Sequence, residues 1–318
     1  MPVLNEERHL ESAVRHVLAQ AYPGEIQVVL AVGPSKDRTQ EVADALAAAD
    51  PRVKAVPNPT GKTPAALNAA LRVASNPVIA RVDGHAMLPD DYLRVAVETL
   101  EATGAENVGG IMAAEGVTAF EQAVARAMTS RFGVGNAAFH TGGQAGPADT
   151  VYLGVFRREA LDRVGGYDEE YIRAQDWEMN HRIRSSGGLI WFEPRMRVSY
   201  RPRPNLKALA RQYFDYGRWR RVVARQHRGT INLRYLAPPG AVVAIAAGVV
   251  VGAAGFWPAF AIPGVYVLGV LGAAAATGKG LPLAAKAWLP LAYASMHLPW
   301  GLGFLTSPAR LVPHRKKK

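Results

Sequence analysis

The longest uncharged stretch of the chain sets the strongest limit on its fold. Positions 235–278 are 44 consecutive residues without Asp, Glu, Lys or Arg. At about 1.5 Å per residue, a helix of that length would be about twice as long as the roughly 30 Å hydrocarbon core of a membrane. Pro258 and Pro263 lie near its middle, so we expect two membrane-spanning helices, at about 237–255 and 259–277, joined by an aromatic turn. A buried pair of soluble helices is the disfavoured alternative.

A third apolar segment follows at 282–305, but it contains Lys286, Pro290, His297 and Pro299. It could cross the membrane or lie at its surface. Basic residues in short flanking segments favour the cytoplasmic side of a membrane, and they are concentrated in 201–235 and in the tail 315–318. Two spans would place both segments in the cytoplasm. We therefore expect two firm spans, a re-entrant or interfacial third segment and a cytoplasmic C-terminus.

The sequence divides into four expected parts. These are a folded domain at 1–200, a basic amphipathic juxtamembrane segment at 201–235, a membrane region at 236–305 and a basic tail at 306–318. The start of the chain is not apolar enough for a signal peptide. The folded domain is thus expected in the cytoplasm, on a multi-pass protein of the inner (cytoplasmic) membrane.

Charge is distributed unevenly between these parts. The chain has a net charge of +11, but residues 201–235 contain ten Lys or Arg against one acid, and residues 1–200 carry a net charge of −5. A nucleic-acid-binding domain usually carries positive charge on its folded face, so no nucleic-acid partner is expected. The chain has no cysteine, which excludes disulfides, cysteine metal sites and a cysteine nucleophile.

The first hundred residues alternate between helical and strand patterns, which predicts an α/β domain with a mostly parallel sheet. Ligands bind at the carboxyl ends of the strands in such sheets, where Gly33, Asp37 and Asp83 fall. A strand would normally precede Asn5, so we expect either a truncated start or a sheet that lacks its first strand. The expected helices are 6–20, 39–49, 63–74 and 90–100, and the expected strands are 26–32, 53–56 and 78–82.

Two polar groups stand out against this pattern. The apolar run 79–82 ends in Asp83-Gly84-His85, and the period of two along a strand places both side chains on one face. A carboxylate and an imidazole together suit a divalent cation that carries phosphates, although an exposed polar strand end is the alternative. About ninety residues later, Asp176 lies at the head of an amphipathic segment.

In sequence order, the motifs of this chain resemble those of the family 2 inverting glycosyltransferases, whose fold is GT-A. The resemblance covers about 1–230 and is strongest to the bacterial exopolysaccharide branch, which includes the succinoglycan-biosynthesis glucosyltransferases. It implies a GT-A nucleotide-sugar-binding domain followed by a C-terminal helical membrane region. The matching segments are Pro2–Glu7, Ser35–Thr39, Gly61–Asn68, Asp83–His85, Gly165–Glu169, Gln175–Glu178 and Gln212 with Arg218-Trp219.

The resemblance also implies roles for individual residues. Asp83 and His85 would hold Mn²⁺ or Mg²⁺ at the diphosphate, and Asp176 would be the general base that deprotonates an acceptor hydroxyl. The residues implied in donor binding are Asn5, Glu6, Asp37, Lys62, Asp83, Gln212, Arg218 and Trp219. Those implied in acceptor binding are Asp149, Tyr167, Asp168 and Trp177.

Each role has a simpler structural alternative. Asp176 could be a helix N-cap, Lys62 a solvated loop lysine, and Tyr167 and Trp177 buried aromatic residues. The basic run 218–221 could close over the diphosphate or form a polybasic collar on anionic lipid.

The chain departs from the family pattern at three places. Val32 and Gly33 replace two loop aspartates, so a UDP-sugar is the expected donor but no carboxylate is available there to recognise its base. His85 replaces a metal-binding aspartate, which could alter the affinity for the cation or its choice. Gln175 replaces a glutamate, and the loss of that negative charge should favour the ionised form of Asp176.

The sequence leaves three functions open. The first is a membrane-anchored inverting glycosyltransferase that moves a sugar from a nucleotide-sugar donor to a lipid-linked or growing polysaccharide acceptor. The second is a polyprenyl-phosphate sugar synthase, whose anionic acceptor Arg173, Arg182 and Arg184 would suit. The third is a non-catalytic membrane protein on a decayed transferase fold.

Overall fold

The computed structural model describes residues 1–313, so the basic tail predicted at 315–318 lies outside the described residues. The chain forms two compact units. Unit 1 comprises Met1–Ala113 and Gly142–Tyr200, and unit 2 comprises Ala114–Thr141 and the chain from Arg201 onward. The sequence analysis placed all of 1–200 in one domain, whereas the structure groups Ala114–Thr141 with the C-terminal helices. Packing explains this difference, because the helix formed by Ala119–Met128 lies against the helix formed by Leu283–Leu305.

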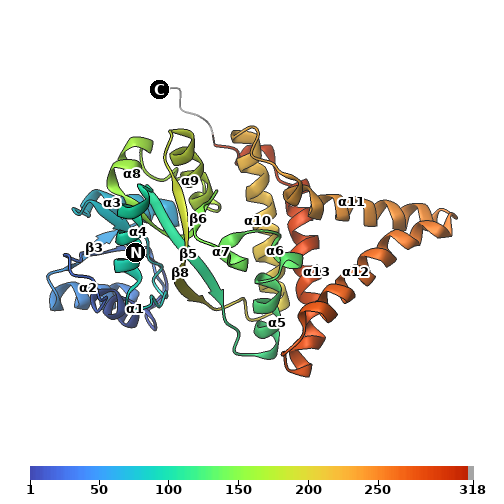
Figure 1. Ribbon diagram of the computed structural model, residues 1–318, viewed down its shortest axis with the longest axis horizontal. Coiled ribbons are helices and arrows are strands. Elements are labelled where there is room, and N and C mark those ends of the chain that lie inside the picture. Colours follow the sequence, from blue (N-terminus) through green and yellow to red (C-terminus); the bar gives the residue numbers. More distant parts are fainter. Residues whose placement is uncertain (314–318) are drawn as a thin grey trace. The chain divides into compact units, whose positions relative to one another are not determined.

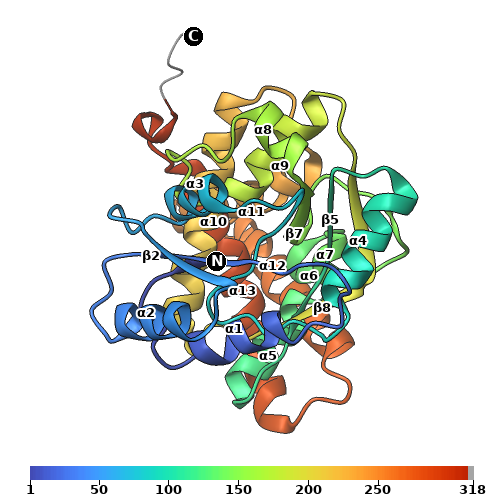
Figure 2. The ribbon, with the colours of Figure 1, turned by 90° about the vertical axis from the view of Figure 1, so that its left-hand side faces the viewer.

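The first sheet of unit 1 is parallel, with the order β1-β2-β3. All five residues of β2 are buried, as expected for a parallel strand covered on both faces. Figure 2 shows α3 on one side of β2 and α1 with α2 on the other. The bounds are β1 Pro2–Val3, α1 Leu10–Leu18, β2 Val28–Val32, α2 Thr39–Ala49, β3 Val53–Pro57 and α3 Thr63–Val73. These elements agree with the predicted ranges to within a few residues, except that β1 forms where the sequence analysis expected no strand.

The second sheet has five strands in the order β4-β7-β5-β8-β6. Its pairs β4/β7, β5/β7 and β6/β8 are antiparallel. The predicted parallel arrangement thus describes the first sheet, and the antiparallel pairs involve strands beyond residue 100, which the sequence analysis did not assign. The bounds are β4 Val78–Ala80, α4 Tyr92–Thr103, β5 Asn107–Ala114, β6 Gly146–Pro147, β7 Tyr152–Arg157, α8 Arg158–Val164, α9 Gln175–Ser185 and β8 Ile190–Tyr200.

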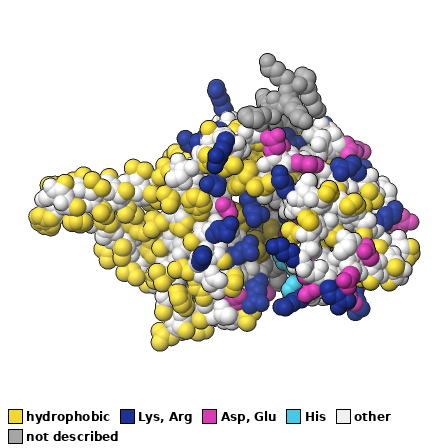
Figure 3. Space-filling model, turned by 180° about the vertical axis from the view of Figure 1, so that it is seen from behind, with side chains coloured by type: hydrophobic (Ala, Val, Ile, Leu, Met, Phe, Trp, Pro, Cys, Tyr) yellow, Lys and Arg dark blue, Asp and Glu magenta, His cyan; other side chains and the backbone are white. Residues whose placement is uncertain are grey.

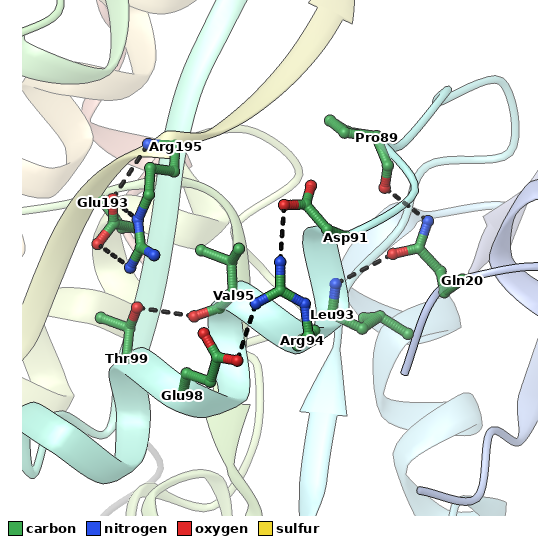
Figure 4. A network of polar contacts seen from close by, with 10 residues as sticks. All are labelled: Gln20, Pro89, Asp91, Leu93, Arg94, Val95, Glu98, Thr99, Glu193 and Arg195. Carbon is green, nitrogen blue, oxygen red and sulfur yellow. Dashed lines mark hydrogen bonds and ion pairs between the residues drawn. The ribbon is translucent and has the colours of Figure 1, made fainter. Parts of the chain in front are cut away.

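A buried glutamine fixes the start of α4 within unit 1 (Figure 4). The side-chain amide of Gln20 donates to the carbonyl of Pro89 over 2.7 Å, and its oxygen accepts from the backbone N–H of Leu93 over 3.0 Å. Both bonds are shielded from water, so they satisfy backbone groups that would otherwise be buried without partners. The ion pairs of Arg94 in the same view are half-exposed and are worth less than about 1 kcal/mol each.

Apart from Ala114, the last residue of β5, the regular elements in the described part of unit 2 are helices. A capping box at Thr118 and Glu121 starts α5, and the Glu121 carboxylate also accepts from Arg201 over 2.9 Å. Burial acts to raise the pKa of Glu121, but the backbone N–H of Thr118 and the Arg201 guanidinium outweigh it and the pKa is lowered. Glu121 therefore stays ionised and joins the two chain segments of the unit. The helices are α5 Ala119–Met128, α6 Arg131–Val134, α7 Ala138–Thr141, α10 Leu206–Gln226, α11 Leu233–Ala253, η1 Trp257–Phe260, α12 Ala261–Thr277, α13 Leu283–Leu305 and η2 Ala309–Leu311.

Two helices in the described part of the chain are long and apolar enough to cross a membrane, Leu233–Ala253 and Trp257–Thr277. They form the hairpin at α11 and α12 in Figure 1, and hydrophobic side chains cover that hairpin in Figure 3. The first begins four residues before the predicted start at 237. The third apolar segment, 282–305, forms α13, which runs unbroken through its two prolines and packs against α10, α5 and α11.

Glycines allow α10 and α13 to pack with their backbones in contact. A Cβ atom on Gly217 of α10 would lie 1.9 Å from the carbonyl oxygen of Trp300. A Cβ atom on Gly303 of α13 would lie 2.0 Å from the carbonyl oxygen of Phe214. Because backbone atoms cannot retreat as a flexible side chain can, any side chain at either position must push the two helices apart.

We predict opposite effects for two helical glycines of unit 2. Gly303→Ala should lower the unfolding temperature, because the new Cβ meets a carbonyl oxygen of α10. Gly264→Ala in α12 is the matched control, since no atom lies within 4 Å of its Cβ position and alanine is favoured over glycine in a helix by about 1 kcal/mol. Thermal unfolding in detergent measures both variants. Equal effects of the two substitutions would contradict the close packing of α10 and α13.

Candidate active site

Two loops at the carboxyl ends of β1 and β2 are bound to each other. The N–H of Asn5 donates to the Ser35 hydroxyl over 3.0 Å, and the Asn5 side chain accepts from the N–H of Lys36 over 2.8 Å. The next residue, Glu6, donates its N–H to the Thr39 hydroxyl over 2.7 Å. Asn5 has a left-handed backbone with φ of 56°, which asparagine tolerates better than most residues. The loop after β1 is thus hydrogen-bonded to the loop after β2 through Asn5 and Glu6.

Asp37 is bound within this pair of loops. Its carboxylate accepts from the N–H and hydroxyl of Thr39 and from the N–H of Glu7. The Thr39 hydroxyl is the main cause of the lowered pKa of Asp37. These bonds give Asp37 a local structural role, and its predicted contact with the donor remains a prediction. Lys62 lies at the N-cap position of α3 with an exposed side chain.

The turn after β4 presents the predicted metal ligands. Asp83 is 23% exposed and His85 is 57% exposed. The Nδ1 atom of His85 lies 2.7 Å from an Oε1 atom of Glu6, whose own side chain is only 17% exposed. A carboxylate that binds one ring nitrogen fixes the orientation of a histidine, as is typical beside metal ions. Glu6, a predicted donor-binding residue, therefore lies beside the predicted metal-binding histidine.

Arg81 connects the turn after β4 to α9. Its side chain is 10% exposed, and its Nη2 atom donates to Oδ1 of Asp83 over 2.9 Å. Its Nη1 atom forms an ion pair with the carboxylate of Asp176. Burial acts to lower the pKa of Arg81, but Asp176 and Asp83 outweigh it and the pKa is raised. One charged guanidinium thus brings together the two carboxylates to which the sequence analysis gave separate roles.

The sequence analysis did not single out Arg81. The signal that could have found it is the alternation of the predicted strand at 78–82, in which Arg81 and Asp83 are two positions apart, although β4 itself ends at Ala80. An arginine two positions before a predicted metal-binding aspartate is a charge that needs a partner once it is buried. The pattern does not identify the second carboxylate that pairs with Arg81. That carboxylate belongs to Asp176 of α9, about ninety residues away.

Asp176 is not the N-cap of its helix. The N-cap of α9 is Ala174, with φ of 59° and no side-chain capping bond. Asp176 is the second residue of the helix, and its side chain is 37% exposed. Its Oδ1 atom is buried without a hydrogen-bond partner among residues 1–313. The carboxylate therefore has one oxygen held by Arg81 and another, Oδ1, that is enclosed by protein without a hydrogen bond.

Asn68 of α3 holds the turn that carries Tyr167 and Asp168. It accepts from the N–H of Tyr167 over 2.8 Å and donates to the carbonyl of Tyr167 over 2.8 Å and to the Glu169 carboxylate over 2.9 Å. Gly166, with φ of 73°, makes this approach possible, since a Cβ there would lie 2.8 Å from the Asn68 side-chain oxygen. Burial raises the pKa of Asp168. The Tyr167 ring is buried, as its structural alternative predicted.

The remaining predicted acceptor-side residues also have partners within unit 1. Asp149 forms an ion pair with Arg184 over 3.3 Å. Trp177 stacks on the His181 ring with a centroid distance of 5.3 Å. Arg182 is bound to Glu178 by a forked pair of contacts at 2.7 Å and 2.9 Å. Two of the three arginines that would suit an anionic acceptor are therefore already neutralised by carboxylates.

Comparison with known proteins identifies the chain. The family model described as Glycosyl transferase family 2 matches residues 1–165. The succinoglycan biosynthesis protein ExoA of Rhizobium meliloti (strain 1021) is 35% identical over 311 residues, which cover 96% of this chain and 92% of ExoA. The chain belongs to glycosyltransferase family 2. This confirms the predicted family and identifies the protein as a glycosyltransferase.

Other relatives of this glycosyltransferase are more distant. A dolichyl N-acetyl-α-D-glucosaminyl phosphate 3-β-D-2,3-diacetamido-2,3-dideoxy-β-D-glucuronosyltransferase of Methanococcus voltae is 24% identical, covering 76% of this chain and 77% of that protein. The mannosyltransferase PcManGT from Pyrobaculum calidifontis, solved with GDP-Man and Mn²⁺, is 19% identical with a TM-score of 0.60 and covers 96% of this chain and 85% of PcManGT. S. aureus TarS 1–349 is 14% identical with a TM-score of 0.52 and covers 96% of this chain and 89% of TarS. The solved structures confirm the predicted GT-A fold.

Three predicted donor-binding residues of the glycosyltransferase belong to unit 2, on α10. Gln212 donates to the Tyr216 hydroxyl over 2.7 Å. The Arg218 guanidinium lies 5.2 Å from the centre of the Phe214 ring, and Trp219 is buried with 4% of its surface exposed. Their contact with a donor stays a prediction.

Proposed function

We propose that this family 2 glycosyltransferase is membrane-anchored and inverting, and that it transfers a sugar from a nucleotide-sugar donor to a lipid-linked or growing polysaccharide acceptor. The observation that carries the proposal is the pairing of Asp83 and Asp176 on Arg81. It brings a carboxylate suited to the donor diphosphate next to a carboxylate suited to activate a hydroxyl. The name of ExoA, a succinoglycan biosynthesis protein, supports the polysaccharide acceptor.

On the donor side, Asp83 and His85 would hold Mn²⁺ or Mg²⁺, and Glu6 would orient the histidine ring. No cluster of three or more His, Asp or Glu residues suited to a metal exists within residues 1–313. Two protein ligands nevertheless fit these cations, which are usually bound by one or two side chains together with substrate phosphates. When bound, the cation would neutralise charge that develops on the leaving diphosphate. PcManGT was solved with GDP-Man and Mn²⁺, which supports this role.

On the acceptor side, Asp176 would act as the general base. The acceptor oxygen attacks the anomeric carbon from the face opposite the diphosphate, so a C–O bond forms there as the bond to the diphosphate breaks. The hydroxyl proton passes to the Asp176 carboxylate, whose side chain is 37% exposed and so within reach of an acceptor. Attack from the opposite face inverts the configuration of that carbon.

The membrane attachment rests on α11 and α12 and on the basic segment before them. Both helices are long enough to span the hydrocarbon core, as the length rule for helices in membranes requires. Residues 201–235 carry ten basic side chains, and those that lie near an anionic membrane surface would contribute about 1 kcal/mol each. The catalytic unit would then lie in the cytoplasm, beside a lipid-linked acceptor in the same membrane.

The polyprenyl-phosphate sugar synthase is the less supported alternative. It would need basic side chains near Asp176 for the acceptor phosphate. Arg182 is bound to Glu178 and Arg184 to Asp149, which leaves Arg173 as the remaining arginine of the predicted set. A polysaccharide acceptor, which presents a neutral hydroxyl, fits this arrangement better.

We predict that Asp176→Asn lowers the turnover number by about 10²–10⁴-fold, the usual contribution of a positioned base. The KM for the donor should change little, because the base acts in the transition state rather than in donor binding. Purified protein is assayed for transfer from UDP-glucose, UDP-N-acetylglucosamine and GDP-mannose with Mn²⁺ and total membrane lipid. Asp162→Asn, an exposed aspartate of α8, is the matched control. Turnover of Asp176→Asn within a few-fold of the unmodified protein would mean that another residue is the base.

Donor binding should depend on a divalent cation held at Asp83. Asp83→Ala is expected to abolish the metal-dependent binding of nucleoside diphosphate, because it removes the carboxylate ligand. His85→Asp should retain binding, since it restores the carboxylate pair that is usual in the family. Calorimetry with UDP and GDP, in Mn²⁺ and in chelator, measures both. Binding that is equally tight in chelator would overturn the metal assignment.

The topology is tested with reporter fusions. We predict an extracytoplasmic signal for a fusion at 256–258, between the two spans, and a cytoplasmic signal for a fusion after residue 318. Basic segments on both sides of the spans favour this orientation. An extracytoplasmic signal after residue 318 would instead require a third span, for which α13 is the candidate.

A further inference from the structure

We infer that Arg81 is the positioning residue of this active site, which sets the orientation of Asp176 and its distance from the donor side. The inference rests on the proposed function and extends it. Arg81 touches two carboxylates that come from different elements, Asp83 after β4 and Asp176 in the first turn of α9. No other side chain in the described part of the chain is recorded as binding both.

The shape of arginine matters for this role. A guanidinium is planar and holds its donors in a rigid fork, so two carboxylates bound to its two Nη atoms are held at a fixed separation. Lysine carries the same charge at a single, freely rotating nitrogen. The Arg81 side chain is largely buried, so neighbouring side chains restrict its movement and its position is transmitted to both partners.

Charge gives Arg81 a second effect. Two carboxylates that share a site repel each other. The positive charge of Arg81, which is paired with both Asp83 and Asp176, offsets this repulsion and allows the two side chains to lie near each other. Asp83 and His85 would hold the divalent cation, and the ion pair of Arg81 with Asp176 uses the other Nη atom of the guanidinium.

The same geometry makes Arg81 a competitor for the cation. Its Nη2 atom occupies Oδ1 of Asp83 over 2.9 Å, and an oxygen that accepts a strong charge-assisted hydrogen bond is less available to a metal. Removing the forked guanidinium should therefore leave metal-dependent donor binding intact or make it tighter. Turnover should fall at the same time. A residue that served only to stabilise the fold would instead weaken both together.

The test compares Arg81→Lys with the unmodified full-length protein. We expect turnover to fall by about 10–10²-fold, as for a base that is displaced, with UDP and Mn²⁺ binding by calorimetry within threefold or tighter. Arg163→Lys, which alters another arginine–carboxylate pair of unit 1, with Glu106, is the matched control and should keep full turnover. A loss of donor binding in parallel with turnover, or turnover of Arg81→Lys within threefold of the unmodified protein, would overturn the inference.

A double variant shows whether Arg81 acts through Asp176. If it does, Arg81→Lys combined with Asp176→Asn should turn over no more slowly than Asp176→Asn alone, to within about threefold, because residues that act as a unit are not additive. Multiplied losses would mean that Arg81 acts elsewhere, and would overturn the inference while leaving the proposed base in place. Full activity of Asp176→Asn alone would instead refute the base, and the inference with it.

A second variant guards against failure to fold. In Arg81→Gly, added guanidinium chloride at millimolar concentration should restore turnover in a concentration-dependent way, whereas ammonium chloride should not. Recovery with both salts would show that charge alone is needed and would overturn the role of the fork. No recovery with either salt, in protein that keeps its donor binding, would also count against the inference.

Discussion

A single buried guanidinium joins the two carboxylates on which the proposed reaction of this glycosyltransferase depends. Arg81 lies between the strand that leads to Asp83 and the helix that begins with Gln175. Without that contact, the carboxylates would belong to separate elements with no shared anchor. With it, the proposed donor side and the proposed acceptor side are attached to the same side chain. The surrounding loops are also held by side-chain hydrogen bonds. Asn5 binds the loop at 35–39, and Asn68 binds the backbone of Tyr167.

Much of the first hundred residues could be predicted from the sequence because its signals are local. The helix at 39–49 and the strand at 53–56 are predicted from the spacing of their own apolar residues and from the polar residues and prolines at their ends. Both appear in the structure. The second sheet could not be predicted in this way. Its strands β7 and β8 pair with partners far away in sequence, and an antiparallel partner is set by tertiary packing rather than by composition. The grouping of Ala114–Thr141 with the C-terminal helices likewise depends on tertiary packing.

For the candidate site, the sequence indicated which residues could take part but not which side chains they contact. Asp83, His85 and Asp176 were chosen from motif order, and the structure adds what each one touches. Asp176 could have been a helix cap on sequence grounds, and only the position of Ala174 at the N-cap removed that alternative. The sequence alone leaves Arg182 and Arg184 available to an anionic acceptor. In the structure, Arg182 is paired with Glu178 and Arg184 with Asp149. Burial and pairing decide such questions, and neither is visible in a single sequence.

The contact between Asn68 and Gly166 has a consequence for the history of the family. A side chain at 166 would need both a left-handed backbone and the space now filled by the Asn68 oxygen, 2.8 Å from the Cβ position. The two sites therefore cannot drift independently. A lineage that replaces the glycine must first shorten or reorient the residue at position 68, and it would lose the bonds to Tyr167 as it did so. In related chains, these two positions should covary although about a hundred residues separate them.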